Sequence, residues 1–68
     1  MNKFAERLKE LRTDKGLTML DLAKETGFSR AAIGRWENKS RVPNIEVLTV
    51  FAKYFKVSSD YLLGLTDY

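Results

Sequence analysis

Residues 18–38 read TMLDLAKETGFSRAAIGRWEN, and this stretch decides the fold of the chain. Its apolar spacing predicts two short amphipathic helices, over 19–26 and 30–38, joined by the turn Gly27-Phe28-Ser29. Gly27 can adopt the left-handed conformation that ends a helix without a Cβ clash. Two helices that cross over a short turn containing glycine form a helix-turn-helix. The stretch therefore predicts this motif.

Both helices of the motif begin with a start signal. Thr18 and Asp21 have the spacing of a capping box, in which hydroxyl and carboxylate each bind a free backbone N–H group. Ser29 is the expected N-cap of the second helix. Leu17 and Phe28, which precede the two caps, lie at the position from which a hydrophobic staple folds back onto the helix.

Three further helices are expected, over 3–15, 45–55 and 59–63. Asn44 is the expected N-cap of the second of these and Ser58 of the third. The core stripe of the helix over 45–55 is expected to be Ile45, Leu48, Phe51 or Ala52, and Phe55. No strand pattern is present, so the predicted fold class is all-α, a five-helix orthogonal bundle.

Length and composition narrow the function classes. With 68 residues, the chain is expected to form one domain over 1–68. It contains no Cys and no His, which excludes disulfides and zinc sites built on thiolate or imidazole. No catalytic residues, cofactor or metal are expected, and the chain is not expected to be an enzyme. No apolar run approaches the ~18 residues of a membrane span, so no membrane partner and a cytoplasmic location are expected.

Positive charge is concentrated in the second half of the motif and the segment after it. The formal net charge is +3, and residues 29–56 carry six basic side chains against only Glu37 and Glu46. Such an excess suits an anionic partner. The alternative is a solvated surface that happens to be basic.

The helix over 30–38 has two different faces. Ile33 and Trp36 project to one side, which we expect to be buried. The other side carries Arg30, Ala31, Gly34, Arg35 and Asn38. Glycine inside a helix costs ~1 kcal/mol relative to alanine, but small exposed residues let a partner approach the backbone. Arginine can pair with guanine and an alanine methyl can contact thymine, so this face suits a DNA major groove.

Several short motifs occur in order along the chain: RLKELR (7–12), GLT (16–18), LA (22–23), GFS (27–29), WEN (36–38), FAKYFKVS (51–58) and DYLLG (60–64). With this order and spacing, the chain over Phe4–Gly64 resembles the Xre/Cro–repressor family of helix-turn-helix DNA-binding domains. The resemblance implies a lambda-repressor-like fold. It also implies a sequence-specific transcriptional regulator of bacterial or phage origin, a repressor, which binds double-stranded DNA with residues 30–38 in the major groove of a palindromic operator.

The resemblance also implies roles for individual residues. Bases would be read by Arg30, Ala31, Gly34 and Arg35, although Arg35 could instead contact a phosphate. The DNA backbone would be contacted by Thr18, Met19, Ser29, Asn38, Lys39, Ser40 and Arg41. Arg12 and Glu37 would form a structural ion pair, the alternative being two unrelated surface charges.

Two positions depart from the family pattern. Met19 stands where the family often has a glutamine that contacts a phosphate and braces the recognition helix, so that anchor is missing or replaced. Lys39 stands where glycine is usual. This lysine either adds a phosphate contact or leaves Asn38 in a left-handed conformation.

A motif of this kind usually binds as a two-fold dimer. We expect a weak homodimer that DNA strengthens. The candidate dimer surface is Val50, Tyr54, Tyr61, Leu65 and Tyr68, and the alternative is that these side chains complete the core. An alternative function is a protein-interaction module, such as an antitoxin or adaptor, that keeps the fold and buries Met19, Leu20 and Val50 against a partner.

Overall fold

The computed structural model describes residues 3–67, which form five α-helices and no strand. The helices are α1 (Phe4–Asp14), α2 (Met19–Thr26), α3 (Arg30–Glu37), α4 (Ile45–Phe55) and α5 (Ser59–Leu63). The predicted all-α class is confirmed, and the predicted helices over 19–26, 45–55 and 59–63 have the observed bounds. The helix expected over 3–15 is one residue shorter at each end, and the one expected over 30–38 ends at Glu37.

Side-chain caps define four of these helix starts. Thr18, Ser29, Asn44 and Ser58 each accept a hydrogen bond from the backbone N–H group three residues on. The Thr18 N–H also donates to the Asp21 carboxylate, which completes the predicted capping box and lowers the pKa of that carboxyl below its ordinary value. These caps are local interactions, so each helix start is specified by its own sequence.

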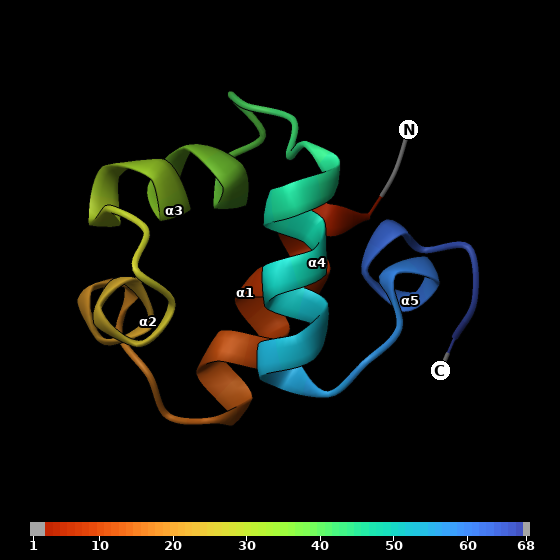
Figure 1. Ribbon diagram of the computed structural model, residues 1–68, viewed down its shortest axis with the longest axis horizontal. Helices are drawn as coiled ribbons and strands as arrows, with labels where there is room; N and C mark the ends of the chain where they lie inside the picture. Colours follow the sequence, from red (N-terminus) through yellow and green to blue (C-terminus); the bar gives the residue numbers. More distant parts are fainter. Residues whose placement is uncertain (1–2, 68) are drawn as a thin grey trace.

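The helices pack at steep angles around a single core (Figure 1). α4 crosses the middle of the view in front of α1, with α2 and α3 on one side of it and α5 on the other. α3 contacts both α1 and α2, while α5 contacts α1 and α4. The helix-turn-helix formed by α2 and α3 is therefore packed against the first helix of the chain through α3.

Aromatic side chains fill the centre of this core. Phe51 is fully buried and lies against Phe28 and Trp36 at ring-centroid distances of 5.2 and 5.6 Å. All five helices contribute to the buried cluster, which comprises Phe4, Leu8, Leu22, Ala23, Ile33, Trp36, Phe51 and Leu62. Full burial of one large apolar side chain stabilises a fold by about 1.5–3 kcal/mol, so this cluster contributes strongly to the stability of the fold.

One residue expected in the core is exposed. Ile45 was predicted to lie on the buried stripe of α4, but its side chain is 81% exposed. The stripe begins one turn later, with Leu48 half-buried and Phe51 fully buried. The first turn of α4 extends beyond the core, and Val42 just before it is also exposed. Within residues 3–67, no helix has the length and apolar character needed to cross a bilayer.

Candidate nucleic-acid interface

α3 has a buried side and a charged side. Ile33 and Trp36 are buried in the core, as predicted. Arg30, Ala31 and Arg35 are exposed on the opposite side. Neither arginine forms an ion pair with any of residues 3–67. The outer side of α3 therefore presents two guanidinium groups that are available to an external anion.

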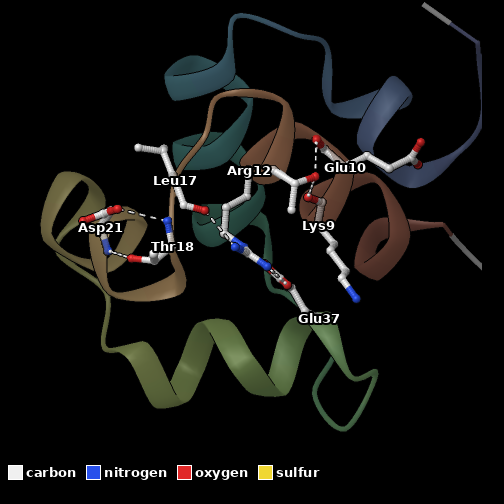
Figure 2. Close-up of polar contacts among 8 residues, drawn as sticks. Lys9, Glu10, Arg12, Leu17, Thr18, Asp21 and Glu37 are labelled. Atoms are coloured by element: carbon white, nitrogen blue, oxygen red, sulfur yellow. Dashed lines mark hydrogen bonds and ion pairs between the residues drawn. The ribbon is translucent and has the colours of Figure 1, made fainter.

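A bidentate ion pair fixes the position of α3 (Figure 2). Arg12 Nε donates to Glu37 Oε2 at 2.7 Å, and Arg12 Nη2 donates to Glu37 Oε1 at 3.0 Å. Arg12 Nη1 also donates to the Leu17 carbonyl at 2.8 Å. The Glu37 hydrogen bond raises the pKa of Arg12 above its ordinary value. One guanidinium thus joins α1, the loop before α2 and the end of α3, and the alternative of two unrelated surface charges is wrong.

The Met19 side chain packs beside α3. Its side chain is half-buried against the core, and a Cβ atom added at Gly34 would lie 3.9 Å from Met19 Sδ. Gly34 is thus half-buried at the contact between α2 and α3 and does not lie fully on the outer face where the sequence placed it. The Met19 side chain therefore packs on the core beside Gly34 of α3, at the position where the family often has a glutamine.

The end of α3 is set by Lys39, which has a left-handed backbone with φ of +68°. The N–H groups of Lys39 and Ser40 donate back to the carbonyls of Trp36 and Arg35. This pattern is a Schellman motif, whose left-handed position glycine normally occupies. Asn38 has φ of −96°, so the expectation of a left-handed Asn38 is wrong and Lys39 itself adopts that conformation.

Asn38 and Ser40 shape the loop after α3. Asn38 Oδ1 accepts hydrogen bonds from both the backbone N–H and the hydroxyl of Ser40. These groups are therefore already used within the protein, whereas the Asn38 amide NH₂ group forms no hydrogen bond with residues 3–67. Lys39 Nζ lies 3.4 Å from Glu6 Oε1, and both side chains are more than half exposed. Such a surface pair contributes little to stability and can exchange partners.

The two N-caps of the motif are also exposed. Thr18 Oγ1 accepts from the Asp21 N–H group at 3.0 Å, and Ser29 Oγ accepts from the Ala32 N–H group at 3.0 Å. Each hydroxyl uses its oxygen as the cap and keeps its hydrogen for a partner outside the protein. The positive ends of α2 and α3 lie at these two caps.

The candidate dimer surface is partly occupied within the protein. Tyr54 donates to Glu25 at 3.2 Å, and Arg7 lies 4.1 Å from the centroid of the Tyr61 ring. Partial desolvation and the Glu25 carboxylate raise the pKa of the Tyr54 hydroxyl. Val50 and Leu65 are exposed, while Tyr68 lies outside the described residues. The available apolar surface is thus smaller than the sequence suggested.

Sequence reasoning missed two features of this interface. The left-handed Lys39 has only an indirect signal, its place at a position where the resembling family has glycine. The contact between Met19 and Gly34 joins two helices, and no local pattern in either helix reports it. Both features determine how α3 is held and where it ends.

α2 and α3 begin at side-chain caps, and α3 has one buried side and one exposed cationic side. Together these features define a helix-turn-helix DNA-binding domain. The chain belongs to the helix-turn-helix family HTH_3, whose model matches residues 8–62. The family resemblance inferred from the sequence motifs is thereby confirmed. The family is one of DNA-binding domains and not of enzymes.

Relatives and solved structures agree with this family. The HTH-type transcriptional regulator YobD of Bacillus subtilis is 39% identical over 64 residues, covering 94% of this chain and 57% of that protein. The HTH-type transcriptional activator BcrR of Enterococcus faecalis is 44% identical over 62 residues, covering 91% of this chain and 30% of that protein. The chain thus spans about half or less of the length of these relatives.

A solved complex is similar to almost the whole chain. The P22 c2 repressor, crystallised with a synthetic operator, is 33% identical with a TM-score of 0.83. The match covers 93% of this chain and 96% of that one. The lambda-repressor-like fold expected from the sequence is therefore confirmed.

Proposed function

We propose that this domain binds double-stranded DNA sequence-specifically, with α3 in the major groove of a palindromic operator. The observation that carries the proposal is the outer side of α3, where Arg30 and Arg35 are exposed without an ion pair to residues 3–67. The similarity to the P22 c2 repressor, which was crystallised with operator DNA, supports the same mode of binding.

Arg30 and Arg35 are the proposed base readers. An arginine bound through two hydrogen bonds to guanine discriminates against other bases by ~1–3 kcal/mol. Ala31 offers a methyl group to thymine, and Gly34 lets the helix backbone approach the groove. Arg35 lies one turn further along α3, so a phosphate contact is the alternative role for its guanidinium.

Contacts to the DNA backbone are proposed on both sides of α3. Before it, the hydroxyls of Thr18 and Ser29 and the first-turn N–H group of Met19 point to phosphate binding at helix N-termini. After it, Lys39, Arg41 and the amide NH₂ group of Asn38 would bind phosphates, with Ser40 holding Asn38 in place. These contacts would add affinity without sequence information.

Repression is the proposed regulatory outcome. The relatives carry names of both kinds, an activator in BcrR and a repressor in P22 c2. The chain covers 96% of the crystallised P22 c2 chain but only 30% of BcrR. A domain of this size that occupies an operator can act by excluding other proteins from the same DNA. The cytoplasm is the proposed location, since the operator lies there in a bacterium.

A weak homodimer, strengthened on DNA, is proposed as the binding species. Two-fold symmetry would place two copies of α3 about one helical turn apart on the operator. Val50 and Leu65 provide exposed apolar side chains for the dimer surface, with Tyr54 and Tyr61 at its margin. Sedimentation should show a monomer in dilute solution and two copies on a palindromic site. A strict monomer that binds a palindrome one to one contradicts the dimer.

The alternative, a protein-interaction module, has one supporting observation. Leu20 is 50% exposed on α2, where a partner could cover it. Met19, however, is half-buried against Gly34 and offers less surface than the sequence suggested. Specific DNA binding that Arg30→Ala and Arg35→Ala weaken would favour the DNA-binding function over this alternative.

Selection of bound sequences from random duplex DNA tests the proposed function. The expected result is an enriched palindrome with half-site centres about 10 base pairs apart. Affinity for the selected site should fall linearly with the logarithm of salt concentration, with a slope of about −0.9 per phosphate contact. Failure to enrich any sequence, or a salt slope near zero, would contradict the proposal.

A further inference from the structure

A small cavity lies beside the end of α3, away from the proposed base-reading side chains. It has a volume of about 190 Å³ and lies between the start of α1 and the loop over residues 39–43. Its apolar walls are formed by Phe4, Ala5, Trp36, Val42 and Pro43. The proposed DNA contacts account for none of these apolar side chains.

One residue of this wall, Trp36, carries a buried hydrogen-bond donor. Trp36 is 4% exposed, and its indole Nε1–H group has no hydrogen-bond partner among residues 3–67. Buried polar groups in proteins almost always have a partner, so this donor is an exception. Because the same tryptophan also lines the cavity, its indole N–H group reports on what the cavity contains.

Two cations complete the lining of the same cavity. Arg41 forms no ion pair with any of residues 3–67, and Lys39 has only its exposed contact with Glu6 at 3.4 Å. Ala5 lies in the first turn of α1, at the positive end of that helix dipole. The positive end of that helix therefore adds to the field of the two cations. One side of the cavity favours an anion, and the other favours an apolar group.

Size restricts the occupant further. An apolar cavity of about 150 Å³ is sufficient to hold benzene. A cavity of about 190 Å³ accommodates one six-membered ring and a short polar substituent. We propose that this cavity binds a small aromatic carboxylate. The ring packs against Trp36 and Val42, and the carboxylate pairs with Arg41 and Lys39.

Such a ligand would oppose DNA binding, and this consequence rests on the proposed function. Lys39 and Arg41 are proposed above to bind phosphates, so carboxylate and DNA would compete for the same two side chains. By linkage, each ligand lowers the affinity of the other by the same factor. The cavity would then act as an effector site within the DNA-binding domain itself.

The single tryptophan of the chain makes the proposal directly testable. Its indole N–H group gives one resonance in a proton–nitrogen correlation spectrum, recorded on the free protein at constant ionic strength. Benzoate is the probe, benzyl alcohol supplies the ring without charge, and acetate supplies the charge without a ring. Benzoate should shift the resonance saturably, with a dissociation constant on the order of 1 mM. The other two compounds should bind at least about tenfold more weakly.

Variants separate the parts of the site. Arg41→Gln should weaken benzoate binding about tenfold, whereas Lys53→Gln, which removes an exposed cation outside the cavity lining, should not. Val42 is 77% exposed, so Val42→Phe should fold normally while its ring obstructs the cavity and abolishes binding. Thermal unfolding of each variant establishes that the fold is intact.

Three outcomes would overturn the proposal. The first is the absence of a saturable shift with benzoate. The second is an equal shift with acetate, which would indicate an adventitious anion only. The third is an indole resonance that changes with protein concentration alone, because a second copy would then cover the cavity.

The coupling to DNA is measured separately. Saturating benzoate should weaken binding to the selected operator about fivefold. Unchanged DNA affinity, with benzoate bound, would overturn the effector role and leave the proposed DNA-binding function intact.

Discussion

The two sides of α3 differ in what their side chains contact. On the inner side, Ile33 and Trp36 are buried and Glu37 forms a bidentate pair with Arg12. On the outer side, Arg30 and Arg35 form no ion pair with the described part of the chain. One eight-residue helix thus carries both a large share of the fold and the proposed recognition surface. Substitutions on the two sides should therefore affect different properties.

The largest effect is expected from Glu37→Ala. It leaves the Arg12 guanidinium buried without its partner, and breaking a buried pair in this way costs about 3–5 kcal/mol. Urea denaturation should show most of the stability lost. Replacing both partners at once, with Arg12→Met and Glu37→Leu, should cost much less. If Glu37→Ala lowers the free energy of unfolding by less than 1 kcal/mol, the ion pair with Arg12 does not hold α3 in place.

Ile33→Ala is expected to have the next largest effect. It should lower the free energy of unfolding by about 2–5 kcal/mol, because it removes buried atoms and leaves a cavity in the core. Ile33→Val should cost only about 0.5–1.5 kcal/mol. Arg30→Ala on the outer side is the matched control and should stay within about 0.5 kcal/mol of the parent. If Ile33→Ala and Arg30→Ala lowered the free energy of unfolding equally, the distinction between the two sides of α3 would be wrong.

How far the sequence predicts this molecule depends on whether a feature is local. The caps Thr18, Ser29, Asn44 and Ser58 lie within three residues of the groups they bind, so the helix starts were predictable. The exposure of Ile45 was not predictable from the sequence. Helical periodicity shows that Ile45 shares a side of α4 with Leu48, but it cannot show that the first turn extends past the core.

Contacts between distant residues also limited prediction of the site. The pair of Arg12 and Glu37 came from a family resemblance and not from spacing, because 25 residues separate the partners. Partners for Tyr54 and Tyr61 on other helices could not be read from α4 or α5 alone. The cavity beside Trp36 requires three segments to meet, so no single stretch of sequence indicates it.

Lys39→Gly should affect stability and DNA binding in opposite directions at the end of α3. A left-handed backbone costs a non-glycine residue about 1–2 kcal/mol, so glycine should raise stability by about that amount. The same change removes a proposed phosphate contact, which should reduce the salt slope of DNA binding by about 1. Lys39→Gln should weaken DNA binding without the gain in stability. A gain in DNA affinity for Lys39→Gly would contradict the phosphate contact.

Gly34→Ala should change stability less than Lys39→Gly does. The added Cβ meets Met19 Sδ at an ordinary contact distance of 3.9 Å, and alanine improves helix propensity by about 1 kcal/mol. Thermal unfolding should therefore occur at a slightly higher temperature. Gly34 is half exposed, so the added methyl group should also weaken binding to the selected operator by keeping the helix backbone farther from the groove. Unchanged DNA affinity would remove Gly34 from the proposed reading surface.

The central claim is that the outer side of α3 reads bases. The most direct measurement compares the affinities of the parent, Arg30→Ala and Arg35→Ala for the selected operator and for each of its single base-pair variants. Each substitution should cost ~1–3 kcal/mol on the selected operator and abolish the preference at one base-pair position in each half-site. Both variants should unfold at the same temperature as the parent. Unchanged affinity, or a uniform loss that leaves every base preference intact, would contradict base reading by this helix.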